Sequence, residues 1–109
     1  MKIAISMRHK KVSSHLGSST GFVILALDEA GTICEMKSIK SPRFHRNIPV
    51  FLDLEHVDVV VTKDMCPRAH ELLKELGIGR VICDKSSLEE TVNFVQQQFP
   101  LLQRSMSAA

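Results

Sequence analysis

The chain has 109 residues, of which 44% are hydrophobic, and its formal net charge at neutral pH is +2. A chain of this length folds as one domain and buries roughly two-thirds of its unfolded surface. So small a net charge does not indicate a nucleic-acid-binding protein, and the lack of Trp and Tyr removes the usual stacking platforms for bases. We therefore expect one globular domain with no nucleic-acid partner.

Cysteine usage and the first residues bear on the cellular compartment. The three cysteines, Cys34, Cys66 and Cys83, form no CxxC pair, and their odd number argues against a disulfide framework. The opening MKIAIS is too short for a signal peptide and far shorter than a membrane span of roughly 20 apolar residues. We expect a cytoplasmic protein with no membrane role.

The first half of the chain predicts three strands. Residues 2–6 form a short buried strand, and a polar loop follows over residues 7–19. Residues 21–27 are apolar on both faces, as in a strand that helices cover on each side. A turn over residues 28–31 then leads to a partner strand over residues 32–39, so this pair forms a hairpin.

The second half alternates between helices and strands. The predicted elements are helix 48–56, strand 57–62, a helix from Pro67, strand 80–83 and a helix from Leu88. Asn47 is the expected N-cap of the first helix, and Gly77 ends the second with a left-handed residue. Ser87 begins a capping box in front of the third helix, and Pro100 is expected to end it.

This order of elements predicts an α/β fold. We expect a five-stranded mixed sheet in which residues 21–27 form the one antiparallel strand, with helices on both faces. The architecture is a three-layer domain of the ribonuclease H-like kind. It spans residues 1–99, and residues 100–109 form a carboxyl-terminal tail to which we assign no function.

Four loops follow parallel strands and should therefore share one edge of the sheet, where open α/β sheets bind ligands. These loops are residues 7–19, 40–47, 62–67 and 84–87. The first three contain four candidate metal ligands, namely His9, His15, His45 and Cys66. They also hold or adjoin eight basic residues against one acid, Asp64; the basic residues are Arg8, Lys10, Lys11, Lys40, Arg43, Arg46, Lys63 and Arg68. Such an edge attracts anions.

Several of these residues also have a purely structural interpretation. A single loop histidine such as His15 is more often a hydrogen-bonding residue than a ligand, and Gly17 is explained equally by a positive φ angle. Cys34 and Cys83 fit buried apolar positions. Cys66 stands just before a helix, where the pKa of a thiol can be lowered, and it is the candidate reactive thiol.

Some classes of chemistry are disfavoured. Neither GxxxxGK[ST] nor GxGxxG is present, so the standard phosphate-binding loops are missing, and no spacing matches a closed zinc site. The first strand has no acid, which argues against a two-metal nuclease. A Cys66 and His15 nucleophilic pair is conceivable, but no oxyanion donor is identified. We do not expect an enzyme, and a nuclease is the weakest alternative.

Five blocks occur in a characteristic order over residues 1–99: MKIAIS, SSHLG followed by GFVI, VDVVV, CPRAHELLKELGI and SLEETV. In order and spacing they resemble the dinitrogenase iron-molybdenum cofactor biosynthesis family, of the NifX, NafY and NifB carboxyl-terminal-domain type. The resemblance implies a protein that binds or carries iron-molybdenum cofactor, its iron-sulfur precursor or a related metal-sulfur cluster without turnover. It also implies that His15, in the loop His15-Leu16-Gly17, contacts the cluster.

One segment departs from the family pattern. The family has a glycine-rich turn resembling Gly-Gly-Ile-Gly-Pro where this chain has Lys63-Asp64-Met65-Cys66-Pro67. Two consequences are open: the side chains narrow the pocket, or a Cys66 thiolate and a Lys63 charge replace close backbone contacts there.

The leading hypothesis is therefore a non-catalytic cluster carrier that exchanges its cluster with assembly or acceptor proteins. The hypothesis gives it the cofactor-binding residues His15, Gly17, Cys66, Lys63 and Arg43, with His15, Cys66, His45 and His9 as metal ligands. The alternative is a regulatory or protein-interaction module on the same fold without a cluster.

Overall fold

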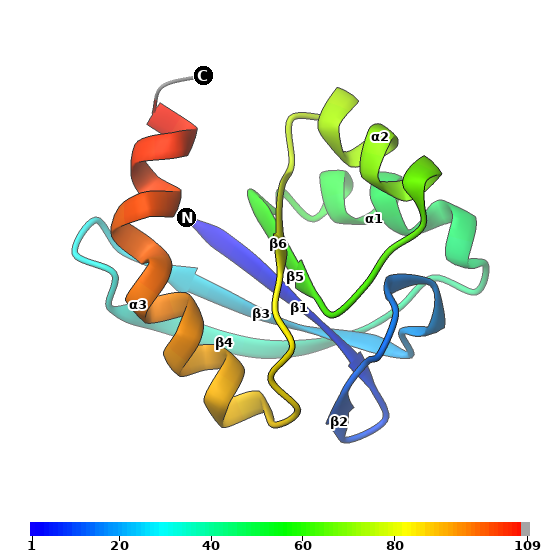
Figure 1. Cartoon of the computed structure of the whole chain (residues 1–109), viewed down its shortest axis with the longest axis horizontal. Helices are drawn as coiled ribbons and strands as arrows, with labels where there is room; N and C mark the ends of the chain where they lie inside the picture. The colour runs from blue at the N-terminus through cyan, green and yellow to red at the C-terminus, as the bar shows by residue number, and fades with distance from the viewer. Residues whose placement is uncertain (108–109) are drawn as a thin grey trace.

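The structure is a computed structural model that describes residues 1–107 (Figure 1). Its strands are β1 (Lys2–Arg8), β2 (Lys11–Val12), β3 (Gly21–Leu27), β4 (Ile33–Lys40), β5 (Val59–Thr62) and β6 (Gly79–Ile82). Its α-helices are α1 (Ile48–Leu54), α2 (Pro67–Glu75) and α3 (Leu88–Ser107), and two short 3-10 helices are η1 (Leu16–Ser18) and η2 (His45–Asn47). Within the described range, no helix is both long and apolar enough to cross a membrane.

The strands form one mixed sheet in the order β4-β3-β1-β5-β6, and β2 pairs with β1 outside this path. β3 runs antiparallel to both of its neighbours, whereas β1, β5 and β6 are parallel to one another. At the centre of the sheet, Ile5 lies between Val23 and Val61. The predicted mixed sheet is confirmed, but the predicted number of five strands was wrong, because the sheet has six.

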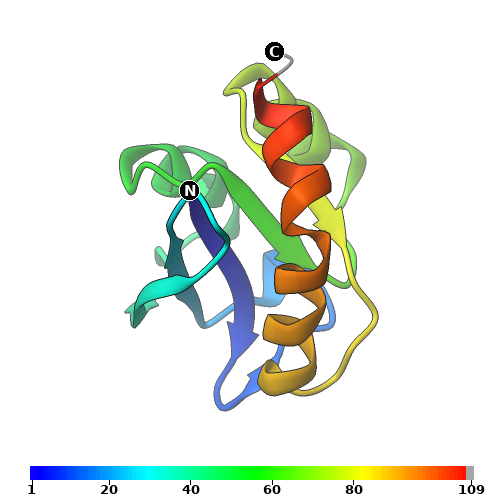
Figure 2. The same ribbon diagram turned by 90° about the vertical axis from the view of Figure 1, so that its left-hand side faces the viewer.

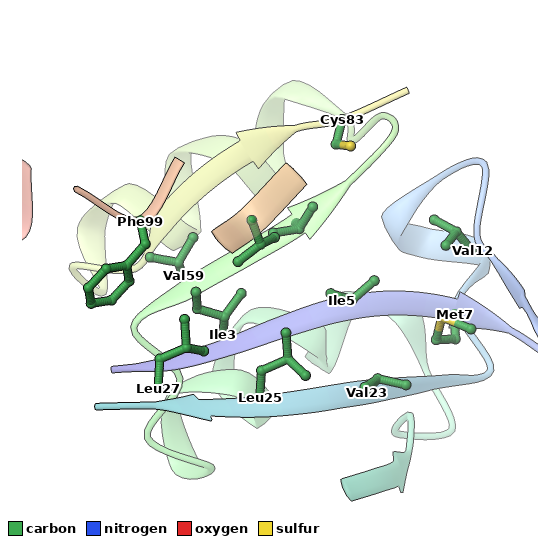
Figure 3. Close-up of a cluster of buried hydrophobic side chains, with 12 residues drawn as sticks. Ile3, Ile5, Met7, Val12, Val23, Leu25, Leu27, Val59, Cys83 and Phe99 are labelled. Carbon is green, nitrogen blue, oxygen red and sulfur yellow. The ribbon is translucent and has the colours of Figure 1, made fainter. Parts of the chain in front are cut away.

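Helices cover both faces of the sheet, with α3 on one face and α1 and α2 on the other (Figures 1 and 2). Alternate side chains of a strand point to opposite faces, so each strand contributes to two cores. Beneath α3, Ile3 and Ile5 of β1 pack in one buried cluster with Phe99 (Figure 3). On the opposite face, Ala4 of β1 packs in a second cluster with residues of α1 and α2, including Leu52 and Leu73.

The sixth strand lies in the segment that the sequence predicted as a loop. β1 continues to Arg8, and a two-residue turn reverses the chain so that Arg8 pairs with Lys11. His9 occupies the turn with a φ of 58°. Histidine is more tolerant of this left-handed region than most residues, but the segment lacks the Asn-Gly or Asp-Gly signal that identifies such turns in a sequence.

Pro100 does not end the last helix, contrary to the prediction. α3 continues through Pro100 as far as Ser107, because apolar side chains on both sides of the proline pack on the sheet. Phe99 is buried, and Gly31 of the β3–β4 turn lies directly beneath it, where a Cβ would be 2.8 Å from the ring. Leu102, beyond the proline, packs against the same core.

Of the two predicted N-caps, only Ser87 makes the expected hydrogen bond. Ser87 caps α3, since its Oγ accepts a hydrogen bond from the Glu90 N–H at 3.1 Å. Asn47 precedes α1 as expected, but its side chain makes no capping bond, because η2 runs directly into α1 and gives Asn47 a helical backbone.

The two cysteines that were interpreted as buried differ in the structure. Cys83 is buried as interpreted, whereas Cys34 is exposed because it lies on the edge strand β4.

Candidate functional site

A pocket of about 360 Å³ lies where η1, η2 and the beginning of α2 meet. Each of these segments comes from a different loop at the carboxyl edge of the sheet, so the pocket is built from residues far apart in the sequence. It is lined by His15, Leu16, Gly17, His45, Arg46, Asn47, Pro49, Cys66, Arg68, Ala69 and Leu72. Three of the four predicted metal ligands, His15, His45 and Cys66, therefore line the same pocket.

His15 is the N-cap residue of η1, and a hydrogen bond fixes its ring. The backbone N–H of Gly17 donates to His15 Nδ1 at 2.9 Å, which satisfies one of the free amides at the start of the helix. The side chain is half-buried in the pocket wall. The hydrogen-bonding interpretation of His15 is thus borne out. The same side chain lines the pocket, and its role as a ligand stays a prediction.

Hydrogen bonds hold the His15 loop together and join it to the loop after β5. Ser13 is fully buried, and its Oγ donates to the His15 carbonyl oxygen at 2.6 Å. The Leu16 N–H donates to the carbonyl oxygen of Asp64 at 2.8 Å, and the same oxygen accepts a bond from Thr62 Oγ1. The loop after β1 is therefore tied directly to the loop after β5, which fixes the position of η1 beside the beginning of α2.

Gly17 lies in a tight space, and its backbone conformation does not call for a glycine. Its φ angle does not lie in the left-handed region, in contrast to those of Gly31 and Gly77. A Cβ on Gly17 would lie 3.2 Å from His15 Nδ1 and 3.7 Å from Cδ2 of His45. Gly17 therefore lies between two imidazole rings in the pocket wall, and the alternative explanation from a positive φ angle does not apply.

η2 supplies a cationic wall to the pocket. His45, Arg46 and Asn47 are all exposed on this short helix and line the pocket. The guanidinium of Arg46 lies 5.2 Å from the ring centroid of Phe44, and that of Arg43 lies 5.4 Å from the same ring. Cation–π contacts of this kind hold the two guanidinium groups beside an exposed aromatic ring.

The first turn of α2 forms another part of the pocket wall. Cys66 is the N-cap residue of α2, but its side chain makes no capping hydrogen bond, so the exposed thiol is free to meet a ligand. Arg68 lines the pocket from the same turn. Ala69 and Leu72 follow at helical spacing and give this wall an apolar portion.

Three predicted site residues lie outside this pocket. His9 is in the β1–β2 turn and lines two more open depressions on that side of the molecule. Lys63 points towards the β6–α3 loop, where its Nζ donates to Ser86 Oγ at 3.3 Å. Arg43 contacts Phe44 but does not line the pocket. Lys63 is therefore not among the residues that line the pocket, and its predicted role in place of the glycine-rich turn stays a prediction.

The pocket combines apolar residues with side chains that carry hydrogen-bond donors. Imidazole, guanidinium and amide groups line it, and none of its lining residues is Asp or Glu. Across residues 1–107, no three His, Cys, Asp or Glu side chains come together in an arrangement that could hold a metal ion. The pocket therefore suits an anion better than a bare cation.

Sequence reasoning underestimated three residues of the pocket. Arg46 and Arg68 were counted only among the basic residues of the sheet edge, and Asn47 only as a helix cap. The helical spacing of Cys66, Ala69 and Leu72 is the sequence signal that could have placed one wall, because residues three apart lie on one face.

Comparison with known proteins shows where this fold recurs. PH0822 is 24% identical over 91% of this chain and 88% of its own, with a TM-score of 0.76. MJ0327 from Methanocaldococcus jannaschii, provisionally named a dinitrogenase, is 18% identical over 89% of this chain and 88% of its own, with a TM-score of 0.75. TM1290 from Thermotoga, provisionally named a NifB protein, is 14% identical over 88% of this chain and 87% of its own, with a TM-score of 0.69. At these identities the likeness shows a shared fold.

The sequence comparisons address the family directly. No curated protein matches the chain. The sequence model described as dinitrogenase iron-molybdenum cofactor matches residues 1–98, nearly the whole described chain. The resemblance seen in the blocks from MKIAIS to SLEETV is thereby confirmed, and the chain belongs to the dinitrogenase iron-molybdenum cofactor family.

Proposed function

We propose that this protein is a non-catalytic carrier of iron-molybdenum cofactor, its iron-sulfur precursor or a related metal-sulfur cluster, held in the pocket between η1, η2 and α2. The observation that supports the proposal most is the composition of this pocket. Its polar groups are donors and cations from three loops, without a carboxylate among the lining residues. Metal-sulfur clusters of this kind are anionic and expose sulfur atoms, which accept hydrogen bonds.

Within this proposal His15 and Cys66 are the principal contacts. His15 lines the pocket from η1 and Cys66 from the beginning of α2, and Gly17 lies beside the rings of His15 and His45. His45 and Arg46 contribute from the third side. Lys63, Arg43 and His9 remain candidates only for contact with a docked protein, since their positions are outside the pocket. The donor or acceptor proteins of the cluster are the proposed partners.

The proposed fold class is ribonuclease H-like, and the protein is proposed to act in the cytoplasm. The strand order, with β3 antiparallel at the second position from one edge, supports this architecture. Asp or Glu is missing from β1, so the carboxylates of a two-metal nuclease have no counterpart on that strand. This supports a carrier rather than a nuclease.

Anaerobic reconstitution with iron, sulfide and molybdate tests the function. We expect the wild-type protein to retain a cluster, seen by visible absorption, EPR and metal analysis, and the variants His15→Ala and Cys66→Ala to retain several-fold less. His70→Ala is the matched control, because His70 lies on α2 but does not line the pocket. Equal uptake by all four proteins would contradict the assignment of the site.

A protein-interaction module is the second candidate function. The observation in its favour is the exposed Phe44 flanked by the guanidinium groups of Arg43 and Arg46, on a surface continuous with the pocket. A wild-type protein that retains no cluster under any reconstitution condition would favour this second function.

A further inference from the structure

The geometry of η1 points to a specific role for His15: we propose that its imidazole acts as a hydrogen-bond donor through Nε2 and does not coordinate a metal. The ligand of the pocket is then an anion that is held by hydrogen bonds and charge, without a bond from this histidine to a metal. This inference rests on the proposed function, because it specifies how the pocket would hold an anionic cluster.

Nδ1 of His15 is already occupied by a hydrogen bond within η1. The Gly17 N–H points at His15 Nδ1 with a donor–acceptor distance of 2.9 Å. A nitrogen that accepts a hydrogen bond uses its lone pair and has no proton. In neutral imidazole the single proton must then be on Nε2. The local fold of η1 therefore selects the tautomer with Nε2–H.

Metal coordination by either nitrogen of His15 would disturb this hydrogen bond. Nε2 could bind a metal only after its proton had moved to Nδ1. Nδ1–H and the Gly17 N–H would then be two donors that face each other at 2.9 Å, with no acceptor between them. Coordination through Nδ1 would instead break the Gly17 bond and leave the start of η1 uncapped. Metal-binding histidines usually show the opposite pattern, in which the second nitrogen donates to an acceptor.

His15 is half-buried in the pocket wall, and within residues 1–107 no hydrogen bond involves Nε2. Its N–H is thus available to a ligand. The neighbouring polar groups of the pocket have the same character, because Arg46, Arg68 and Asn47 also present N–H donors. A donor at His15 completes a set that recognises exposed sulfur or oxygen atoms of an anion.

The tautomer can be measured in the ligand-free protein. Long-range ¹H–¹⁵N correlation spectra of ¹⁵N-histidine-labelled protein, recorded at mildly alkaline pH, distinguish the two neutral tautomers, and the His15→Asn spectrum identifies the His15 signals. We expect the Nε2–H form. The Nδ1–H form would overturn the inference, whatever the outcome of cluster reconstitution, so the two proposals can fail separately.

Binding of tetrathiomolybdate, a sulfur-rich anion, tests the same role by titration. His15→Asn keeps an oxygen that can cap η1 but removes the Nε2 donor, and we expect its affinity to fall about 10- to 100-fold, the usual effect of losing a hydrogen bond to a charged group. His15→Gln, whose longer amide offers an N–H near the position of Nε2, should retain most of the affinity.

The comparison of these variants separates a donor from a metal ligand. The same variants are therefore also compared in the anaerobic reconstitution with iron, sulfide and molybdate, because the molybdenum of tetrathiomolybdate is already held by four sulfides. If imidazole coordinated a metal of the cluster, Gln would be as ineffective as Ala, because a neutral amide is a poor ligand for iron or molybdenum. Equal losses in His15→Gln and His15→Ala would therefore overturn the inference. Failure of the wild-type protein to bind tetrathiomolybdate would also overturn it, because the pocket would then not be an anion site. His70→Ala serves again as the control with unchanged affinity.

Discussion

At Gly17, a single added carbon atom would contact the side chain of His15 in the pocket wall. The space that a Cβ would occupy is bounded by the rings of His15 and His45, and the backbone itself has no left-handed conformation. The presence of a glycine at position 17 is therefore explained by how close the two rings lie to the position of a Cβ. The sequence indicated that the glycine mattered but could not distinguish these two reasons.

The Gly17→Ala variant tests this explanation. The added methyl group would push the His15 ring away from its bond with the Gly17 N–H, so we expect tetrathiomolybdate to bind several-fold more weakly. The free energy of unfolding should change by less than about 1 kcal/mol, since no left-handed backbone is lost. Isothermal titration and urea unfolding measure the two effects.

Gly77→Ala is the matched control at the end of α2. Gly77 has a φ of 76° and open space around its Cα, so a methyl group there meets no neighbour but strains the backbone. We expect the free energy of unfolding to fall by about 1–2 kcal/mol with unchanged anion binding. A Gly17→Ala variant that behaves in the same way would contradict the explanation from space.

At the scale of elements, α3 differs most from the sequence prediction. A proline in a helix interior costs about 3 kcal/mol relative to alanine, so a helix end at Pro100 was the reasonable expectation. Local propensity was overridden by packing on the sheet, because Phe99 and Leu102 both contact the core from opposite sides of the proline. Such an outcome depends on tertiary contacts that no local pattern reports.

The variants Leu102→Ala and Leu101→Ala test the continuation of α3. Leu102 packs against the core, whereas Leu101 is 58% exposed. We expect Leu102→Ala to lower the free energy of unfolding by about 2 kcal/mol, the low end for a buried leucine, and Leu101→Ala to change it by less than about 0.5 kcal/mol. Equal small effects in thermal or urea unfolding would mean that the helix does not pack beyond Pro100.

The other elements were predictable because their signals are local. The apolar strand over residues 21–27, the amphipathic helix from Pro67 and the Ser87 cap all agree with the structure. β2 could not be predicted, since a two-residue strand closed by His9 has no sequence signature. Element boundaries otherwise differ by a residue or two, as expected when pairing partners decide the ends.

At the scale of the whole molecule, topology explains why a pocket could be predicted. Parallel strands end at one edge, so the loops with His15, His45 and Cys66 were expected together, and they line one pocket. Topology alone could not tell which loop residues turn inward. That choice depends on tertiary hydrogen bonds such as that from the Leu16 N–H to the Asp64 carbonyl oxygen.

Five of the basic residues at this edge of the sheet form two separate groups, which the net charge of +2 conceals. Arg46 and Arg68 line the pocket, whereas Arg8, Lys10 and Lys11 surround the more open depression at the β1–β2 turn. Both groups attract anions, but only the first combines charge with imidazole and thiol groups in one enclosure. We propose that the cluster binds beside Arg46 and Arg68.

Amide chemical-shift mapping with tetrathiomolybdate on ¹⁵N-labelled protein is the most direct test of that assignment. We predict that the largest shift changes occur at residues 15–17, 45–47 and 66–69, and that they saturate together as a single site. Changes concentrated at residues 8–11, at the β1–β2 turn, would contradict the account, because they would show that the anion follows surface charge and does not enter the pocket.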